Sequence, residues 1–200
     1  MEELQGDREM RTIDLAKANK LGCFIYVPVF LVYWLPFYFL WQRGLGTNEL
    51  LNSLKIAINP GLFIALLIGI LLVGILLHEL IHGLCWAIFA KGGWRSIKFG
   101  VLWKYATPYC HCRVPLTIPQ YTFGALMPFV VLGFLPAIVA CCTGSVPVLI
   151  FAVFFTAAAI GDFMIVNMIR KEPRQAMILD HPSEAGYYVY LHQEEKGEDE

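Results

Sequence analysis

The chain contains four long hydrophobic runs, each close to the length of about 20 residues that an α-helix needs to cross a bilayer. They cover residues 21–41, 62–90, 121–142 and 146–169. The sequence therefore predicts an all-α membrane protein with about four transmembrane helices. Pro28 and Pro36 predict kinks in the first helix. The second run is longer than one crossing requires, which predicts a tilted or projecting helix.

The segment between the second and third runs, residues 91–119, has a different pattern. Apolar side chains recur there at about every second position, as in a β-strand with one buried face. We expect a membrane-associated β-hairpin between spans two and three, with strands within 94–104 and 110–117. The tail contains one further strand-like stretch at residues 187–191.

The polar segments divide the chain into three parts. Residues 1–20 form a mixed-charge leader, residues 21–169 form the four-span membrane domain, and residues 170–200 form a tail. The leader is not predicted to belong to a cleavable signal peptide, because the hydrophobic run behind it is too long. The acidic end of the tail is predicted to be disordered.

Composition and charge agree with a lipid bilayer as the surroundings of the chain. Hydrophobic residues make up 58% of it and charged residues 16%, with a formal net charge of −1. A chain without a net basic charge is not expected to bind nucleic acid. Lysine and arginine are frequent in the leader, the middle segment and the tail, and sparse in the other two connections. The positive-inside rule therefore predicts a multi-pass membrane protein with both termini in the cytoplasm.

Three ionisable residues interrupt the second hydrophobic run, in the sequence His78-Glu79-Leu80-Ile81-His82. On an α-helix two histidines four residues apart share one face, so both can bind one zinc ion. Zinc activates a bound water, and Glu79 beside it can take the proton as general base. The pattern predicts an enzyme, a zinc metallopeptidase with one zinc per chain.

A catalytic zinc normally has three protein ligands. Asp162 is the only acidic residue in the other three hydrophobic runs. It precedes Arg170 by eight residues, while His82 precedes Lys91 by nine. Two parallel helices therefore bring the aspartate and the histidine to nearly the same depth. We predict Asp162 as the third ligand, and we expect Gly161 to allow close approach of a neighbouring helix or the metal.

Two other groups of residues could bind metal. Cys85 lies seven residues after His78 on the same helix face, but three ligands along one straight helix cannot readily surround an ion. Cys110-His111-Cys112 would direct its thiols to one side of a strand and its imidazole to the other. No second ligand pair accompanies it. Both are weaker candidates than Asp162, whose alternative role is a hydrogen bond to a serine or to the backbone.

Other functions are compatible with the same residues. The protein could be a non-catalytic zinc-binding membrane scaffold, or a divalent-ion transporter. The scarcity of further acidic residues in the hydrophobic runs argues against transport. Replacement of Glu79 by glutamine separates the first two possibilities, because a scaffold would keep its function and a peptidase would lose turnover.

Three motifs carry a resemblance to known proteins. They are the hydrophobic helix with residues 78–83, Gly161-Asp162 in a later helix, and Ala125-Leu126-Met127-Pro128 between them. Together they resemble the site-2-protease-like membrane zincins. More closely, they are similar to a bacterial zincin peptidase family of unknown function. The Asn and Pro residues that site-2 proteases commonly carry before the aspartate are absent.

This resemblance implies a role for each residue of the motifs. His78, His82 and Asp162 would be the metal ligands and Glu79 the catalytic base. The hairpin would present an unwound strand of the substrate, a membrane protein or peptide cut in or near a transmembrane segment. The implied location is the bacterial inner membrane.

Overall fold

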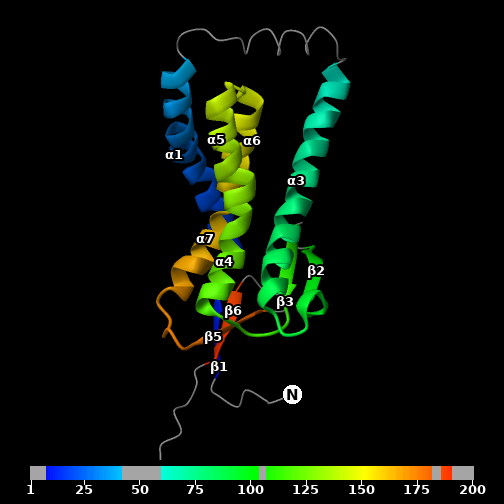
Figure 1. The fold of residues 1–200 in the computed structure, drawn as a ribbon, viewed down its shortest axis with the longest axis vertical. Helices are drawn as coiled ribbons and strands as arrows, with labels where there is room; N and C mark the ends of the chain where they lie inside the picture. Colours follow the sequence, from blue (N-terminus) through cyan, green and yellow to red (C-terminus); the bar gives the residue numbers. More distant parts are fainter. Residues whose placement is uncertain (1–7, 42–59, 104–106, 182–185, 191–200) are drawn as a thin grey trace, which may run out of the picture.

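The structure is a computed structural model that describes residues 8–41, 60–103, 107–181 and 186–190. Its long helices stand side by side, and its strands gather at one end of them (Figure 1). The longer helices are α1 (Leu15–Trp41), α3 (Pro60–Phe89), α4 (Ile118–Pro128), α5 (Leu135–Thr143), α6 (Val146–Ala158) and α7 (Ile160–Ile169). The acidic end of the tail, whose disorder the sequence predicts, lies outside the described residues.

The four predicted hydrophobic runs are present as helices. Three stretches are long and apolar enough to cross a membrane, namely Cys23–Trp41, Ile64–Phe89 and Ile118–Thr143. The pair α6 and α7, bent by 41°, makes a fourth. Only 6% of the apolar window of the first stretch and 11% of that of the second are buried within the protein. Such apolar surface, left uncovered by the rest of the chain, is typical of helices that face lipid.

The first helix starts earlier than the sequence pattern indicates. α1 begins at Leu15, inside the segment assigned to the polar leader, and remains one helix through Pro28 and Pro36. The leader also contains a strand, β1 (Arg8–Thr12). The boundary at residue 20 therefore marks a change in composition, while the change in backbone structure comes about five residues earlier.

The third and fourth hydrophobic runs are interrupted helices. A π-helical segment, η2 (Phe129–Phe134), separates α4 from α5 and follows directly on Pro128. A Cβ atom on Gly133 would lie 2.3 Å from Thr156 Oγ1, so this glycine allows α6 to approach closely. The fourth run breaks at Ala159, which is the C-cap of α6 and the N-cap of α7. The bend places Asp162 in the first turn of α7.

The predicted hairpin is present, with different strand limits. Strands β2 (Ile97–Leu102) and β3 (Thr107–Cys112) pair antiparallel, with Ile97 opposite Cys112. The expectation of a second strand over 110–117 is wrong in its second half. Leu116–Thr117 forms β4, which pairs with β5 (Met177–Asp180) in another sheet. Pro115 stands just before β4 and has no N–H to continue a strand ladder.

The second sheet joins the two ends of the chain. Its strand order is β1-β6-β5-β4, and β1 runs antiparallel to β6 (Gly186–Tyr190). Figure 1 shows this sheet and the hairpin at the same end of the helices. One buried cluster joins them to α3 and α4, since it contains Trp86, Ile97, Tyr121, Ile178 and Tyr187. The sheets are therefore packed onto the end of the helices where α3 carries its histidines.

Candidate metal centre

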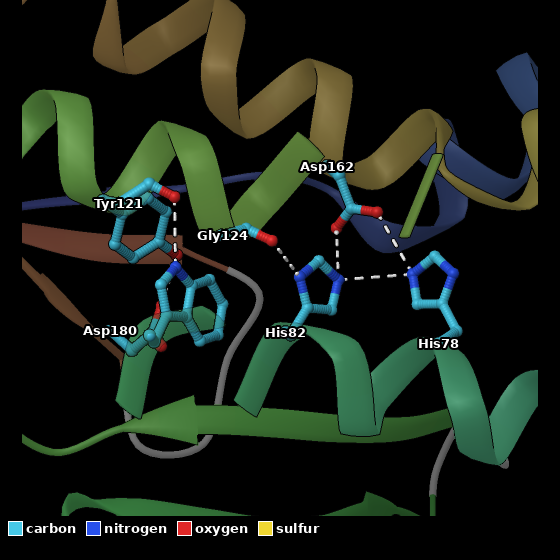
Figure 2. Close-up of polar contacts among 7 residues, drawn as sticks. His78, His82, Tyr121, Gly124, Asp162 and Asp180 are labelled. Carbon is cyan, nitrogen blue, oxygen red and sulfur yellow. Dashed lines mark hydrogen bonds and ion pairs between the residues drawn. The ribbon is translucent and has the colours of Figure 1, made fainter. Parts of the chain in front are cut away.

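Three predicted ligands meet at one point inside the protein. His78 and His82 project from α3 toward Asp162 on α7 (Figure 2). The Nε2 atoms of the two histidines are 3.2 Å apart. His78 Nε2 lies 3.2 Å from Asp162 Oδ2, and His82 Nε2 lies 3.3 Å from Oδ1 of the same carboxylate. Residues far apart in the chain thus form one cluster.

The local structure of each helix explains this convergence. α3 is continuous through the motif, so His78 and His82 stand one turn apart with their ring centroids separated by 4.9 Å. Asp162 lies in the first turn of α7, where the helix dipole favours a negative charge. The break at Ala159 makes this turn the start of a separate helix. An unbroken fourth helix would have no free N-terminus at this depth.

The cluster fits a zinc ion in spacing and in donor type. Tetrahedral zinc with bonds of 2.0–2.2 Å separates its ligand atoms by about 3.3 Å, which is close to the three observed distances. Two imidazole nitrogens and one carboxylate form a donor set that zinc accepts. Asp162 Oδ2 is buried, and although it lies 3.2 Å from His78 Nε2 it has no hydrogen bond of good geometry. Because a buried polar atom without a partner is costly, a cation here would stabilise the arrangement.

His82 is oriented by groups on its other side. Its Nδ1 lies 2.9 Å from the carbonyl oxygen of Gly124 on α4. A carbonyl can only accept, so Nδ1 carries a proton, and in the neutral ring Nε2 is then the nitrogen that can bind a metal. The Trp86 ring stacks on the imidazole with a centroid distance of 5.0 Å and an angle of 14°. A Cβ on residue 124 would lie 2.2 Å from that ring, so the close contact requires glycine.

Glu79 lies beside the cluster on the side of the hairpin. It is partly buried, and it accepts a hydrogen bond from the backbone of Cys110 on β3. The Sγ atom of Cys110 also packs close to Gly83 on α3, where a Cβ would meet it at 3.2 Å. Strand β3 therefore lies directly against the helix that carries the motif. The glutamate is therefore held by this strand at the position next to His78 on α3.

The other candidates from the sequence lie apart from the cluster. Among the described residues, the one group of three or more His, Cys, Asp or Glu side chains with metal-binding geometry is His78, His82 and Asp162. Cys85 is buried but does not belong to this group. The expectation that Gly161 allows close approach of a neighbouring helix is wrong, because a Cβ there would meet nothing within 4 Å. Close approach of the metal at this glycine stays a prediction. Within the described residues, no atom of another helix lies close enough to require a glycine at position 161.

The Cys110-His111-Cys112 segment has the alternation expected of a strand. Cys110 faces α3 and Cys112 donates to the carbonyl of Val114, whereas His111 is opposite Lys98 in the hairpin ladder. Burial raises the pKa of both thiols, that of Cys112 to about 11. At neutral pH both are neutral thiols, and zinc binds thiolates.

Several residues around the cluster were not found from the sequence. They are the ring of Trp86, the carbonyls of Tyr121 and Gly124, and the backbone N–H of Cys110. Trp86 follows His82 by four residues, so helical spacing alone could have indicated that the two rings share a face. The three backbone groups give no signal in the identity of their residues.

Comparison with known proteins gives one match. A family model with the description "Putative zincin peptidase" matches residues 71–177, which is more than half of the chain. The matched range includes His78, Glu79, His82 and Asp162. No curated protein and no solved structure matches this chain.

Proposed function

The chain belongs to the putative zincin peptidase family, and from this premise we propose that it is an intramembrane zinc metallopeptidase. Its substrate would be a peptide bond in or near a transmembrane segment of another protein. His78, His82 and Asp162 would hold the zinc, and Glu79 would act as general base. The observation that carries the proposal is the convergence of three ligand atoms from two apolar helices, with a glutamate beside them.

The metal and the protein have separate tasks in this proposal. A zinc ion held there would act as a Lewis acid that polarises the scissile carbonyl and lowers the pKa of a nearby water toward about 7. The carboxylate of Glu79 would take a proton from the attacking water and give it to the leaving amine. The N–H of Cys110 keeps this carboxylate in place through its hydrogen bond. The carbonyl of Gly124 keeps the tautomer of His82 that leaves Nε2 available.

The position of the cluster favours a substrate that enters from the membrane. The cluster lies on helices that are apolar enough to span a bilayer, near the end where the hairpin packs. A transmembrane helix must unwind locally before its carbonyl can be attacked, because its backbone is fully hydrogen-bonded. The resemblance to site-2 proteases supports a role for the hairpin in holding the unwound strand, and β3 is the strand that contacts Glu79.

The arrangement of the strands supports the proposed topology. β1 and β6, close to the two ends of the chain, pair with each other, and the hairpin lies at the same end of the helices. These are the segments that are rich in lysine and arginine. We therefore propose that this end lies in the cytoplasm, in a bacterial inner membrane.

Glu79→Gln provides the first test. Membranes would be incubated with purified wild-type protein or with this variant, and new protein N-termini would be identified by mass spectrometry. We expect cleavages in or near transmembrane segments with the wild type, and a decrease of about 10²- to 10⁴-fold in their rate with the variant. Both proteins should contain one zinc per chain, because Glu79 is not a proposed ligand.

Three results would contradict all or part of the proposal. Equal sets of N-termini with both proteins would mean that Glu79 is not the base. If Glu79→Gln also restored the growth or membrane phenotype of a deletion strain, a zinc-binding scaffold would explain the protein better than a peptidase. Cleavage confined to soluble segments would keep the peptidase and remove the intramembrane substrate.

A further inference from the structure

Asp180 is a buried carboxylate that lies outside the family match and outside the metal cluster. It is the last residue of β5, three positions beyond the matched range, and only 7% of it is exposed. Its Oδ2 accepts a hydrogen bond of 2.8 Å from the backbone N–H of Cys112. Its Oδ1 accepts a hydrogen bond from the hydroxyl of Tyr121. One side chain thus connects three elements, namely β5, β3 and α4.

The hydrogen bond with Tyr121 connects Asp180 indirectly to His82. Tyr121 lies in the first turn of α4, and its carbonyl accepts a hydrogen bond of 3.0 Å from Trp86 Nε1. Trp86 stacks on the imidazole of His82, and α4 also supplies the Gly124 carbonyl that fixes the same ring. Figure 2 shows Asp180, Tyr121, Gly124 and His82 in one region of the protein. The position of α4 therefore sets two contacts of a proposed ligand.

The hydrogen bond with Cys112 connects Asp180 indirectly to Glu79. Cys112 ends β3, and Cys110, two residues before it on the same strand, bonds to the glutamate. A strand moves as a unit over two residues, because its partner strand fixes its register. Asp180 therefore sets the position of β3 at the point where this strand reaches the proposed base.

We propose that Asp180 is a positioning residue for the metal centre, which it acts on through Tyr121 and through the backbone of Cys112. It holds α4 against His82 and β3 against Glu79, and it touches neither residue itself. This inference rests on the proposed function, since it assumes that the cluster binds zinc and that Glu79 takes part in the reaction. Its consequence is that the sheet formed by the two ends of the chain shapes the site in the helices.

The chain contains a matched control for this pair of groups. Tyr187 is buried and donates to Glu172 Oε1 at 3.2 Å. This second tyrosine–carboxylate pair also attaches the second sheet to the segment after α7, with Arg11 near the same oxygen. Tyr187 is opposite Asp180 in the sheet and packs in the same buried cluster as Trp86, but its hydroxyl bonds to Glu172 and not to a residue that contacts His82 or Glu79. Loss of either pair should destabilise the sheet, but only loss of the Asp180 pair should change the metal centre.

The test measures zinc affinity and the visible spectrum of the cobalt(II)-substituted protein, both on the full chain in detergent. We expect Asp180→Ala to raise the Kd for zinc about 10- to 100-fold and to shift the cobalt bands. Tyr121→Phe should act in the same direction with a smaller effect, because it removes only the hydrogen bond between Asp180 and α4 and keeps the one to Cys112 on β3. Glu172→Ala and Tyr187→Phe should bind both metals as the wild type does.

A conservative variant separates positioning from simple destabilisation. An asparagine at position 180 can accept from the N–H of Cys112 and donate to the hydroxyl oxygen of Tyr121. Asp180→Asn should therefore keep the zinc affinity and the cobalt spectrum of the wild type. If Asp180→Ala fails to fold, the pair Tyr121→Phe and Tyr187→Phe decides the question. Equal zinc affinities and cobalt spectra for Tyr121→Phe and Tyr187→Phe would overturn the inference.

The same measurements distinguish this inference from the proposed function. A wild-type protein that binds no zinc would overturn both. A wild-type protein that binds zinc and responds to Tyr121→Phe, but cleaves no peptide bond, would overturn the peptidase and leave Asp180 as a positioning residue of a zinc site.

Discussion

The protein has two clusters of residues of the kind that bind metals, one between α3 and α7 and one on strand β3. In the first, residues four apart on a helix bring two imidazoles within 3.2 Å of each other. In the second, three consecutive residues of a strand point alternately to opposite sides. A short sequence of metal-binding residue types therefore forms a metal site only where the secondary structure brings the donor atoms together. The helix gathers its donors and the strand separates them.

The two clusters also differ in the protonation of their potential metal-binding atoms. In the neutral imidazole of His82 the proton lies on Nδ1, because the carbonyl of Gly124 accepts from that atom, so Nε2 is the nitrogen available to a metal. Burial keeps the thiols of Cys110 and Cys112 protonated at neutral pH, since it raises their pKa values. The surroundings of His82 therefore favour metal binding, whereas the surroundings of Cys110 and Cys112 favour neutral, buried thiols.

The largest expected effect comes from removal of a proposed ligand in the first cluster, with removal of the cysteines of β3 as the comparison. His78→Ala or Asp162→Ala should leave the purified protein without its zinc, since two protein ligands do not form a closed site. The double variant Cys110→Ser/Cys112→Ser should retain one zinc per chain. Metal content by mass spectrometry measures both. If the protein kept its zinc after Asp162→Ala and lost it in the double cysteine variant, the metal site would be on β3 and not between the helices.

The pH dependence of stability tests the contacts that join the two regions. Burial raises the pKa of Asp180 from 3.8 to about 6, and the charge of Glu79 adds to this rise. The hydrogen bonds from Cys112 and Tyr121 and the charge of His82 oppose it. Since the folded state binds this proton more tightly than the unfolded state, the group should stabilise the fold in acid. That contribution should decrease as the pH rises from about 4 to 6.

The size of this effect follows from the difference in pKa. A rise of about 2 units corresponds to about 3 kcal/mol in total, of which about 1 kcal/mol falls between pH 5 and 7. Asp180→Asn should remove it, so the difference in unfolding free energy between variant and wild type should grow as the pH rises. Chemical unfolding in one detergent at several pH values measures this difference. A difference that stays constant from pH 5 to 7 would mean that Asp180 titrates as an exposed aspartate does.

A smaller effect separates two glycines that both lie near the cluster. A methyl group at Gly124 would collide with the Trp86 ring, while one at Gly161 would meet nothing within 4 Å. We expect Gly124→Ala to destabilise the protein by about 1–3 kcal/mol and to weaken zinc binding, because the displaced ring stacks on His82. Gly161→Ala should be neutral or slightly stabilising, since alanine favours a helix. Thermal unfolding and zinc titration of both variants provide the comparison, and equal results would contradict the contact at Gly124.

The sequence alone predicted the helical runs, the hairpin and the convergence of Asp162 with the two histidines. These features follow from local rules, because the rise and period of a helix fix both depth and face. The limits of β3, the break at Ala159 and the pairing of β1 with β6 do not follow from such rules. They depend on contacts between distant segments, and the position of Asp180 between β3 and α4 depends on them too. Whether the three ligands bind zinc is a prediction that the metal measurements above address.

The pairing of β1 with β6 has a consequence for the order of events during synthesis. Arg8 is opposite Tyr190, so the first strand leaves the ribosome long before its partner. At about 5–20 residues per second this delay is roughly 10 to 40 seconds. Helix α3, with His78, Glu79 and His82, is made early in this interval, but Asp162, Asp180 and the closing strand arrive at its end. A nascent chain would therefore carry an incomplete centre, and hydrolysis would begin only once β6 has been made.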